Sequence, residues 1–220
     1  VTLRIIQNVN KLNLNKNFIL SALNLSFLGS LSRGEIKVDK NLINWPDGIF
    51  SSIYQKKLLK IPGRKLISDL KLNSKIKRII VLGNLSARSK NYLHSKFKLK
   101  ILHKNLPFGD VNMIIKKINI KIVNSDLIFI TLPTPKQEQI ARYLAYQNKY
   151  YKIICIGGSI GIVSGDEKPV PGFLFYLEFI WRLRYETFRR LNRLIKTFYF
   201  FISDTLFIKK LKNIKIKIIN

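Results

Sequence analysis

Short apolar runs rich in β-branched residues alternate with longer amphipathic segments along most of the chain. Four runs have the pattern of buried strands, at residues 18–22, 78–82, 127–131 and 152–156. Helical spacing of apolar positions marks residues 86–97, 110–119 and 135–146. Ser86, Asp110 and Thr134 are the predicted N-caps, and Pro135 takes a first helical position. This alternation predicts an α/β fold built on a parallel sheet.

The pattern changes after Gly165, where two prolines interrupt it. A helical pattern follows over about residues 175–197, with one apolar and one basic face. An aromatic run continues it, and the Lys/Ile-rich stretch at 208–220 fits either a strand or a segment lying on anionic lipid. We therefore predict an α/β core over residues 1–168 and a basic, amphipathic, helical C-terminal appendage over residues 169–220.

Charge indicates the kind of partner. Forty Lys and Arg residues against twelve Asp and Glu give the 220-residue chain a formal net charge of +28. Nucleic acid, a lipid surface or a diphosphate would each suit this charge. No recognised nucleic-acid motif occurs, and the basic residues are not interleaved with aromatics in a stacking pattern, so we expect no nucleic-acid partner.

The expected cellular compartment is inferred mainly from segments that the sequence lacks. No apolar run reaches the roughly 18 to 20 residues that span a bilayer, and no signal peptide is visible at the start of the sequence. The single cysteine, Cys155, lies within a buried apolar run and favours a reducing compartment. We expect a cytoplasmic protein that associates peripherally with the inner face of the membrane.

Asp47 is the first candidate for chemistry. It lies between Pro46 and Gly48, in a turn that would project its carboxylate from the end of a strand. Ligands of parallel α/β folds bind at the carboxyl ends of the strands. There a carboxylate could act as a general base on a hydroxyl group. The alternative is an N-cap for a helix over residues 49–59, and the residues alone favour that cap.

Arginine is the candidate ligand for phosphate. Arg182, Arg189 and Arg193 are spaced seven and four apart and would share one helical face, where planar guanidinium groups can bind phosphate oxygens in pairs. A solvated or lipid-facing basic stripe is the alternative, and periodicity alone favours it. No Asp-x-Asp or Glu-x-Asp pair occurs, and both histidines lie in Lys-rich segments, so we expect no metal site.

Two loops add polar candidates. Gln137 lies in the first turn of a predicted helix and could hydrogen-bond a ligand or simply cap the helix. Glu138 beside it is expected to favour the helix start electrostatically. Gly157 and Gly158 offer space and backbone N–H groups after a strand, although their surroundings do not match the Gly-x-Gly-x-x-Gly fingerprint.

Three motifs occur in register along the second half of the chain: a Pro-Lys-Gln-Glu turn at 135–138, a Gly-Gly loop at 157–158 and a Leu-Glu-Phe-Ile-Trp-Arg-Leu stretch at 177–183. In order and spacing they resemble the WecG/TagA/CpsF family of glycosyltransferases. The resemblance extends from about Asn24 to Arg193. It implies a Rossmann-like parallel sheet of the GT-E type.

The resemblance also implies an activity. It would be inverting, metal-independent and cofactor-free transfer of a sugar such as N-acetylmannosamine, or its uronic acid, from a UDP-sugar donor. The acceptor would be a polyprenyl-diphosphate-linked sugar at an anionic membrane surface, in the synthesis of cell-surface polysaccharide or a teichoic-acid-type polymer. A homo-oligomer is left open, because the oligomeric state influences docking of the C-terminal helix in this family.

Residue roles follow from the same resemblance. Asp47 would be the base, and Asn24 and Gln137 would orient the donor. The substrate-binding set implied in full is Asn24, Gly48, Lys60, Lys136, Gln137, Gly157, Gly158, Arg182, Arg189 and Arg193. Family members use arginines of the C-terminal segment both near the active site and in membrane association.

Two departures from the family pattern bear on activity. Lys60 replaces an arginine and keeps the charge without the bidentate geometry. Gly161 replaces an aspartate of the Gly-Gly loop, which removes a carboxylate near the expected donor site. A weakly active or inactive scaffold on the membrane surface is therefore the alternative to an enzyme, and a nucleic-acid-binding protein is the third and weakest.

Overall fold

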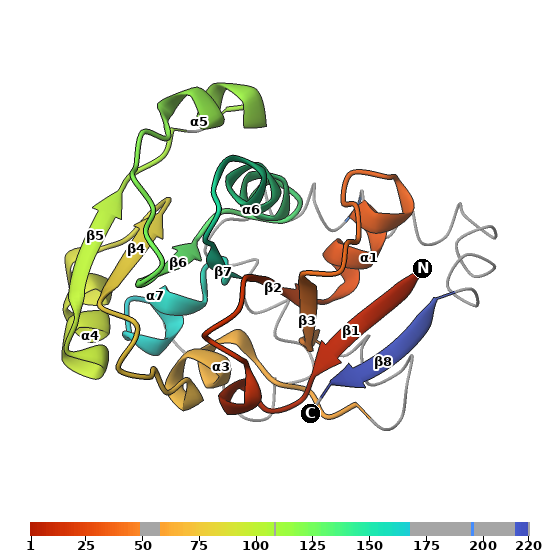
Figure 1. Ribbon diagram of the computed structural model, residues 1–220, viewed down its shortest axis with the longest axis horizontal. Helices are drawn as coiled ribbons and strands as arrows, with labels where there is room; N and C mark the ends of the chain where they lie inside the picture. The colour runs from red at the N-terminus through yellow and green to blue at the C-terminus, as the bar shows by residue number, and fades with distance from the viewer. Residues whose placement is uncertain (49–57, 108, 168–194, 196–213, 220) are drawn as a thin grey trace.

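A computed structural model describes residues 1–48, 58–107, 109–167, 195 and 214–219 of the protein. Its described residues contain one eight-stranded sheet in the order β5-β4-β6-β7-β2-β3-β1-β8, with every pair of neighbours parallel (Figure 1). The strands are β1 (Thr2–Ile6), β2 (Phe18–Leu23), β3 (Leu42–Pro46), β4 (Arg78–Leu82), β5 (Lys100–Lys104), β6 (Asp126–Ile130), β7 (Lys152–Cys155) and β8 (Lys215–Ile219).

Helices cover both faces of this sheet. They are α1 (Leu25–Ser32), α3 (Gly63–Asp69), α4 (Ala87–Phe97), α5 (Val111–Lys117), α6 (Lys136–Gln147) and α7 (Ser159–Val163), with a short 3-10 helix η1 (Val9–Lys11). Helices α1, α5 and α6 lie over one face, and α3, α4 and α7 over the other (Figure 1). The predicted Rossmann-like α/β fold is confirmed.

Each face of the sheet has its own apolar core, because side chains alternate between the faces along a strand. Ile19 and Leu23 of β2 pack with Phe27 of α1 on one face. Leu20, between them in sequence, packs on the other face with Ile67 of α3. Strands buried on both sides are commonly apolar at most positions, which made β2, β4, β6 and β7 visible in the sequence.

All four predicted strands and all three predicted helices are present, with ends shifted by at most two residues. The Ser86 and Asp110 caps are confirmed, since their side chains accept hydrogen bonds from the N–H groups of Ser89 and Met113. The Thr134 cap is wrong: Pro135 is the N-cap, and it makes no side-chain cap bond. Thr134 instead donates its hydroxyl to the buried carboxylate of Glu138, 3.1 Å away.

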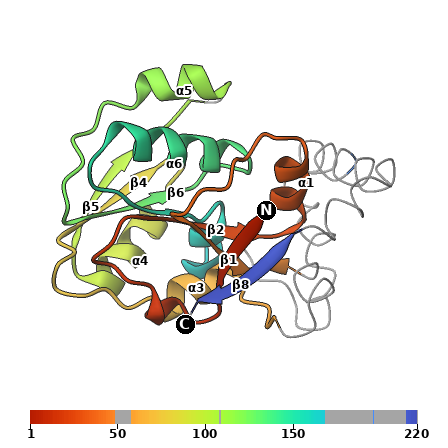
Figure 2. The same ribbon diagram turned by 45° about the vertical axis from the view of Figure 1, so that its right-hand side comes forward.

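The C-terminal stretch forms a strand where the structure describes it. β8 pairs with β1 at the edge of the main sheet, with Lys215 opposite Thr2 and Ile219 opposite Ile6 (Figure 2). Residues 215–219 thus lie in the sheet, although they belong to the predicted appendage. Apart from Ile195, the predicted helix at 175–197 lies outside the described residues, and the division into core and appendage stays a prediction.

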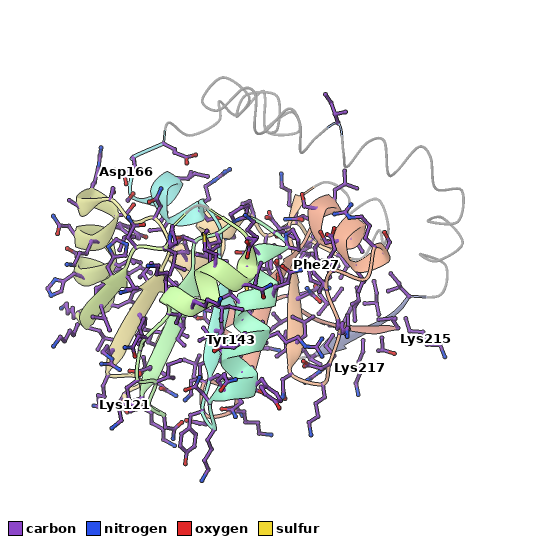
Figure 3. The ribbon with its side chains drawn as sticks, turned by 90° about the horizontal axis from the view of Figure 1, so that it is seen from above. Phe27, Lys121, Tyr143, Asp166, Lys215 and Lys217 are labelled. Carbon is purple, nitrogen blue, oxygen red and sulfur yellow. The ribbon has the colours of Figure 1, made fainter. Side chains whose placement is uncertain are left out.

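A parallel sheet brings all carboxyl ends of its strands to one edge. Figure 3 shows this arrangement: Asp166 lies at the edge where the strands end, and Lys121, which precedes β6, lies at the opposite edge. The predicted site residues in the described part of the chain follow β2, β3, β6 and β7. Those strands are neighbours in the order β6-β7-β2-β3, so the site can form at the middle of the sheet.

Candidate functional site

The adjoining ends of β2 and β3 bring three predicted residues together. Leu23 and Pro46 are opposite one another in the ladder, so Asn24 and Asp47 leave the sheet side by side. The Asp47 N–H group donates to the Leu23 carbonyl at 3.1 Å. Gly48 has a φ of 76°, and a Cβ placed on it would lie 3.8 Å from the Cβ of Asn24.

Asn24 has a structural task at this point. Its Oδ1 atom caps α1 by accepting from the Phe27 N–H group at 3.0 Å, and Phe27 is fully buried beneath the helix. The cap uses the oxygen of the amide. Among the described residues no hydrogen bond from the Asn24 NH₂ group is present, and binding of a ligand by Asn24 stays a prediction.

Lys60 joins this group from the segment before α3. The N–H group of Ile61 donates to the Pro46 carbonyl at 2.7 Å, which places this segment beside Asp47. Lys60 is half-buried there. The backbone that carries Lys60 therefore lies beside the segment that carries Asp47.

Arg64 is a further cation at the same edge, and the sequence analysis did not assign it a role. It lies half-buried in the first turn of α3, directly after Gly63. A Cβ on Gly63 would be 2.2 Å from Oγ of Ser159, so α3 and α7 approach closely at this point. The sequence feature that could have pointed to Arg64 is the Pro-Gly-Arg stretch at residues 62–64. It begins a helix and comes directly after the segment that carries Lys60.

Gln137 connects the loop after β6 with the Gly-Gly loop after β7. Its Oε1 accepts from the Gly157 N–H group at 3.1 Å, and its Nε2 donates to Thr134 at 3.1 Å and to Glu138 at 2.9 Å. The side chain is only 4% exposed. Both ends of the amide are already engaged, so these contacts position Gly157; direct binding of a ligand by Gln137 stays a prediction.

Glu138 is a buried carboxylate behind the Gly-Gly loop. Its Oε1 accepts from Ser21 of β2 at 2.7 Å as well as from Thr134 and Gln137. Its Oε2 is buried without a hydrogen-bond partner among the described residues. Burial raises the pKa of Glu138, although these hydrogen bonds lower it. The sequence predicted a role at the helix start and gave no sign of this burial.

Lys136 is directed toward a different loop. Its ammonium group donates to the carbonyl of Gly109, in the connection between β5 and α5. That hydrogen bond anchors the loop to the first residue of α6. A role for Lys136 in substrate binding stays a prediction.

A carboxylate lies next to Gly161, where the family resemblance leads one to expect an aspartate. A Cβ placed on Gly161 would be 3.8 Å from Oε1 of Glu167, and one placed on Gly158 would be 3.7 Å from the same atom. The N–H groups of Asp166 and Glu167 both donate to the Gly161 carbonyl, at 2.8 Å and 3.0 Å. The turn after α7 thus returns an acidic side chain to the Gly-Gly loop.

Asp166 fixes that turn. Its Oδ2 accepts from the hydroxyl of Ser86, from Ser89 at 2.6 Å and from Ser164 at 3.1 Å. Hydrogen bonds from Ser86 and Ser89 lower the pKa of the Asp166 carboxyl, because they stabilise its charged form. The turn that carries Glu167 is thereby tied to the start of α4.

The three arginines of the C-terminal segment, Arg182, Arg189 and Arg193, lie outside the described residues. Within residues 1–48, 58–107, 109–167, 195 and 214–219, no group of three or more His, Cys, Asp or Glu side chains could hold a metal ion. The helices of this same part of the chain include none that is long and apolar enough to cross a membrane.

Comparison with known proteins identifies the family. The model of the Glycosyl transferase WecG/TagA/CpsF family matches residues 46–215. The chain belongs to this family. It is therefore a glycosyltransferase of cell-surface polysaccharide synthesis, with a sugar donor and a cell-surface acceptor. No curated protein matches the chain.

The matched range contains most of the candidate site of this glycosyltransferase. It starts at Pro46, one residue before Asp47, and continues through Lys60, Gln137 and the Gly-Gly loop. Asn24 precedes the range, so its assignment depends on its position beside Asp47 in the structure.

Proposed function

We propose that this member of the WecG/TagA/CpsF family is an inverting, metal-independent transferase. It moves a sugar of the N-acetylmannosamine or N-acetylmannosaminuronic acid type from a UDP-sugar to a polyprenyl-diphosphate-linked acceptor. The observation that carries the proposal is that Asn24 and Asp47 leave the adjoining ends of β2 and β3 side by side, with the backbone of the segment that carries Lys60 hydrogen-bonded to Pro46.

Asp47 is the proposed general base. Its carboxylate takes the proton of the acceptor hydroxyl while that oxygen attacks the anomeric carbon of the donor. The bond between the anomeric carbon and the UDP oxygen breaks, and UDP leaves with the electron pair. A single displacement inverts the configuration at the anomeric carbon, so one carboxylate is enough.

Cations take the place of a metal in this proposal. Lys60 and Arg64 lie at the same edge as Asp47 and would neutralise the charge that develops on the leaving diphosphate. The backbone of Gly157 and Gly158 leaves room for the donor nearby. Arg182, Arg189 and Arg193 would complete the diphosphate site from the C-terminal segment.

Glu167 is the proposed replacement for the aspartate missing at position 161. Its carboxylate lies beside both Gly158 and Gly161, in the space toward which an aspartate at 161 would extend. A carboxylate at this place, supplied by Glu167 in the absence of the aspartate, supports an active enzyme over an inactive scaffold. The basic C-terminal segment would hold the enzyme peripherally on the anionic inner face of the membrane.

The direct test is UDP release by the full chain over a panel of UDP-sugars. Each reaction contains EDTA and a short-chain polyprenyl-diphosphate-linked N-acetylglucosamine acceptor. Acceptor-dependent release from one donor, with inverted configuration in the product, is the expected result. If no donor of the panel gives UDP release while the protein still binds vesicles, the inactive scaffold is favoured instead.

A further inference from the structure

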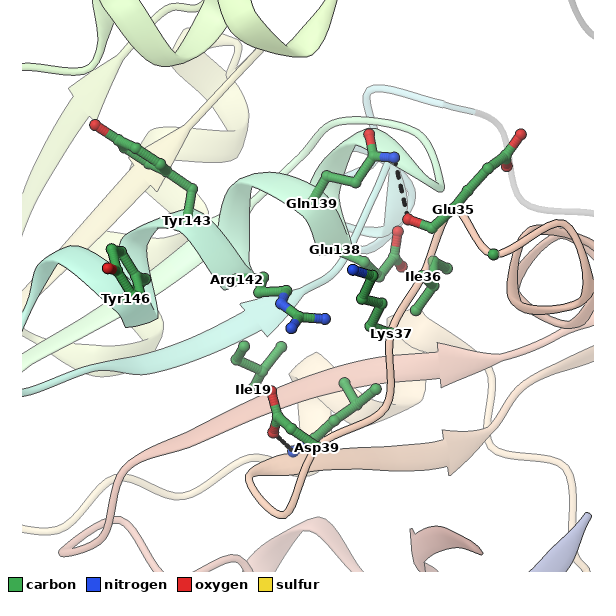
Figure 4. A pocket seen from close by; sticks show the side chains of 12 residues that line it. Ile19, Glu35, Ile36, Lys37, Asp39, Glu138, Gln139, Arg142, Tyr143 and Tyr146 are labelled. Carbon is green, nitrogen blue, oxygen red and sulfur yellow. Dashed lines mark hydrogen bonds between the residues drawn. The ribbon is translucent and has the colours of Figure 1, made fainter. Parts of the chain in front are cut away.

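A cavity lies on the face of the sheet that α6 covers. It has a volume of about 370 Å³ and lies between α6 and the segment of residues 34–42, over β2 (Figure 4). Ile19, Ile36 and Leu42 provide apolar walls, and Tyr143 and Tyr146 border it from α6. None of the predicted catalytic or substrate-binding residues lines it. Binding sites for small molecules have volumes of roughly 300 to 1,000 Å³, so the cavity suits a compact ligand.

A buried carboxyl group lines the inner part of this cavity. Glu138 is 4% exposed, and three side chains donate to its Oε1. Its Oε2 has no hydrogen-bond partner within the described part of the chain. A buried polar atom without a partner costs free energy. A ligand hydroxyl would remove that cost if a shift of the Glu138 side chain brought Oε2 to the cavity.

Two cations border the same cavity from opposite sides. Arg142 extends from α6 and Lys37 from the 34–42 segment, and Figure 4 shows both side chains reaching into the space between them. Among the described residues neither forms an ion pair. The guanidinium group and the ammonium group are thus available to an anion.

The acidic side chains at the cavity are already engaged. Glu35 is paired with Arg33 at 2.8 Å. Asp39 accepts from the backbone N–H groups of Asn41 and Leu42, at 2.7 Å and 3.1 Å. Asp39 keeps its negative charge, while the charge of Glu35 is offset by Arg33. The two cations, Arg142 and Lys37, therefore outnumber Asp39 at the mouth, and Glu138 supplies a carboxyl group inside.

We propose that this cavity is a binding site for a small phosphorylated polyol such as a sugar phosphate. Arg142 and Lys37 hold the phosphate group, and the hydroxyl groups of the sugar extend over the apolar floor toward Glu138. Paired cations suit phosphate, and the tyrosine rings suit the apolar face of a sugar. The proposal does not rest on the transfer reaction, because none of the predicted catalytic or substrate-binding residues lines the cavity; Glu138 is connected to them only through its hydrogen bond with Gln137.

Calorimetric titration of the full chain with glucose 1-phosphate tests the site. We expect a dissociation constant of about 1 mM or tighter, with inorganic phosphate and glucose each binding at least about tenfold more weakly. Arg142→Gln and Lys37→Gln should each weaken binding about tenfold, since each removes a charge-assisted hydrogen bond. Both side chains are exposed, so these variants should fold.

Two controls locate the site. Lys90→Gln removes the same charge from α4, on the other face of the sheet, and Lys75→Gln removes it from the loop before β4; both should bind glucose 1-phosphate as the parent does. The proposal is overturned by an absence of binding up to about 10 mM, by equal binding of inorganic phosphate, or by a control variant that loses as much affinity as Arg142→Gln.

Discussion

Asp47 is the residue whose substitution best separates chemistry from substrate binding. Asparagine keeps the shape of the side chain but cannot take a proton at neutral pH. Asp47→Asn should therefore lower kcat at least about 100-fold, with little change in the KM of the donor. Initial rates of UDP release, measured with the acceptor at saturation, check this expectation.

The matched control is Asp69→Asn, which removes the same charge from a surface ion pair with Lys65. That variant should keep nearly full activity, because exposed ion pairs contribute little. Circular dichroism shows whether each variant is folded. Full turnover by folded Asp47→Asn would exclude Asp47 as the base.

Glu167 should be needed for donor binding if it replaces the missing aspartate. Glu167→Ala is expected to raise the KM of the UDP-sugar about tenfold, since a charged hydrogen-bonding group is lost. Adding Gly161→Asp should restore much of the affinity, because a Cβ there meets only ordinary contacts. If Gly161→Asp does not restore affinity for the UDP-sugar while thermal stability is unchanged, Glu167 does not replace the missing aspartate.

Glu138 should make stability depend on pH. Its pKa is raised by burial in the folded protein, so the folded state binds more protons than the unfolded state at pH values above 4.5. The free energy of unfolding then falls as pH rises through this window. Glu138→Gln removes the titration, and its stability relative to the parent should increase between about pH 5 and pH 8. Urea unfolding at several pH values measures the difference; a constant difference would contradict it.

Asp47 and Gly157 could be singled out as candidate site residues because Asp47 lies in a recognisable Pro-Asp-Gly turn and Gly157 follows a predictable strand. Glu167 could not be found this way. It reaches Gly161 only because a five-residue helix is followed by a turn that Asp166 and three serines fix. Such contacts depend on one tight turn and on hydroxyl groups from another helix. No periodic pattern of apolar and polar residues in the sequence predicts them.

At the level of elements, the length of each apolar run decided what could be predicted. Strands β2, β3, β6 and β7 are buried at every position, and β4 at all but its first. Of these five strands, β2, β4, β6 and β7 contain three or more consecutive apolar residues and were predicted. Strands β5 and β8 carry lysines at exposed positions, and β3 contains Asn44 and Pro46. Polar residues and a proline in such short segments obscure a strand until its neighbours are known.

The contact between α3 and α7 should be sensitive to a single methyl group. Gly63→Ala would place a Cβ 2.2 Å from Oγ of Ser159 and 3.0 Å from its Cβ. Rotating the serine moves Oγ away but leaves the tight contact with its Cβ. We expect a loss of about 1 to 3 kcal/mol in the free energy of unfolding. Gly29→Ala in α1 meets nothing closer than 3.5 Å and serves as the control. Urea unfolding that shows equal stability for both variants would contradict this packing.

For the whole molecule, the position of β8 decides how membrane association can be tested. β8 completes the sheet beside β1, so truncation at residue 168 would remove an edge strand together with the basic segment. Loss of vesicle binding by such a truncation would not distinguish a membrane contact from a disturbed fold. Substitutions within the basic segment avoid this problem, because they leave the strand in place.

Neutralising Arg182, Arg189 and Arg193 with glutamine should weaken binding to phosphatidylserine-containing vesicles by about 100-fold, since each basic residue near an anionic surface contributes about 1 kcal/mol. The control replaces three exposed lysines, Lys71, Lys75 and Lys90, and thus removes the same charge from the core. Co-sedimentation at increasing salt measures both proteins. If the two lose affinity equally, the net charge of +28 acts as a whole and the C-terminal segment makes no specific contact. A large loss confined to the arginine variant would assign the membrane contact to that segment, because a diffuse field would respond to either set of charges.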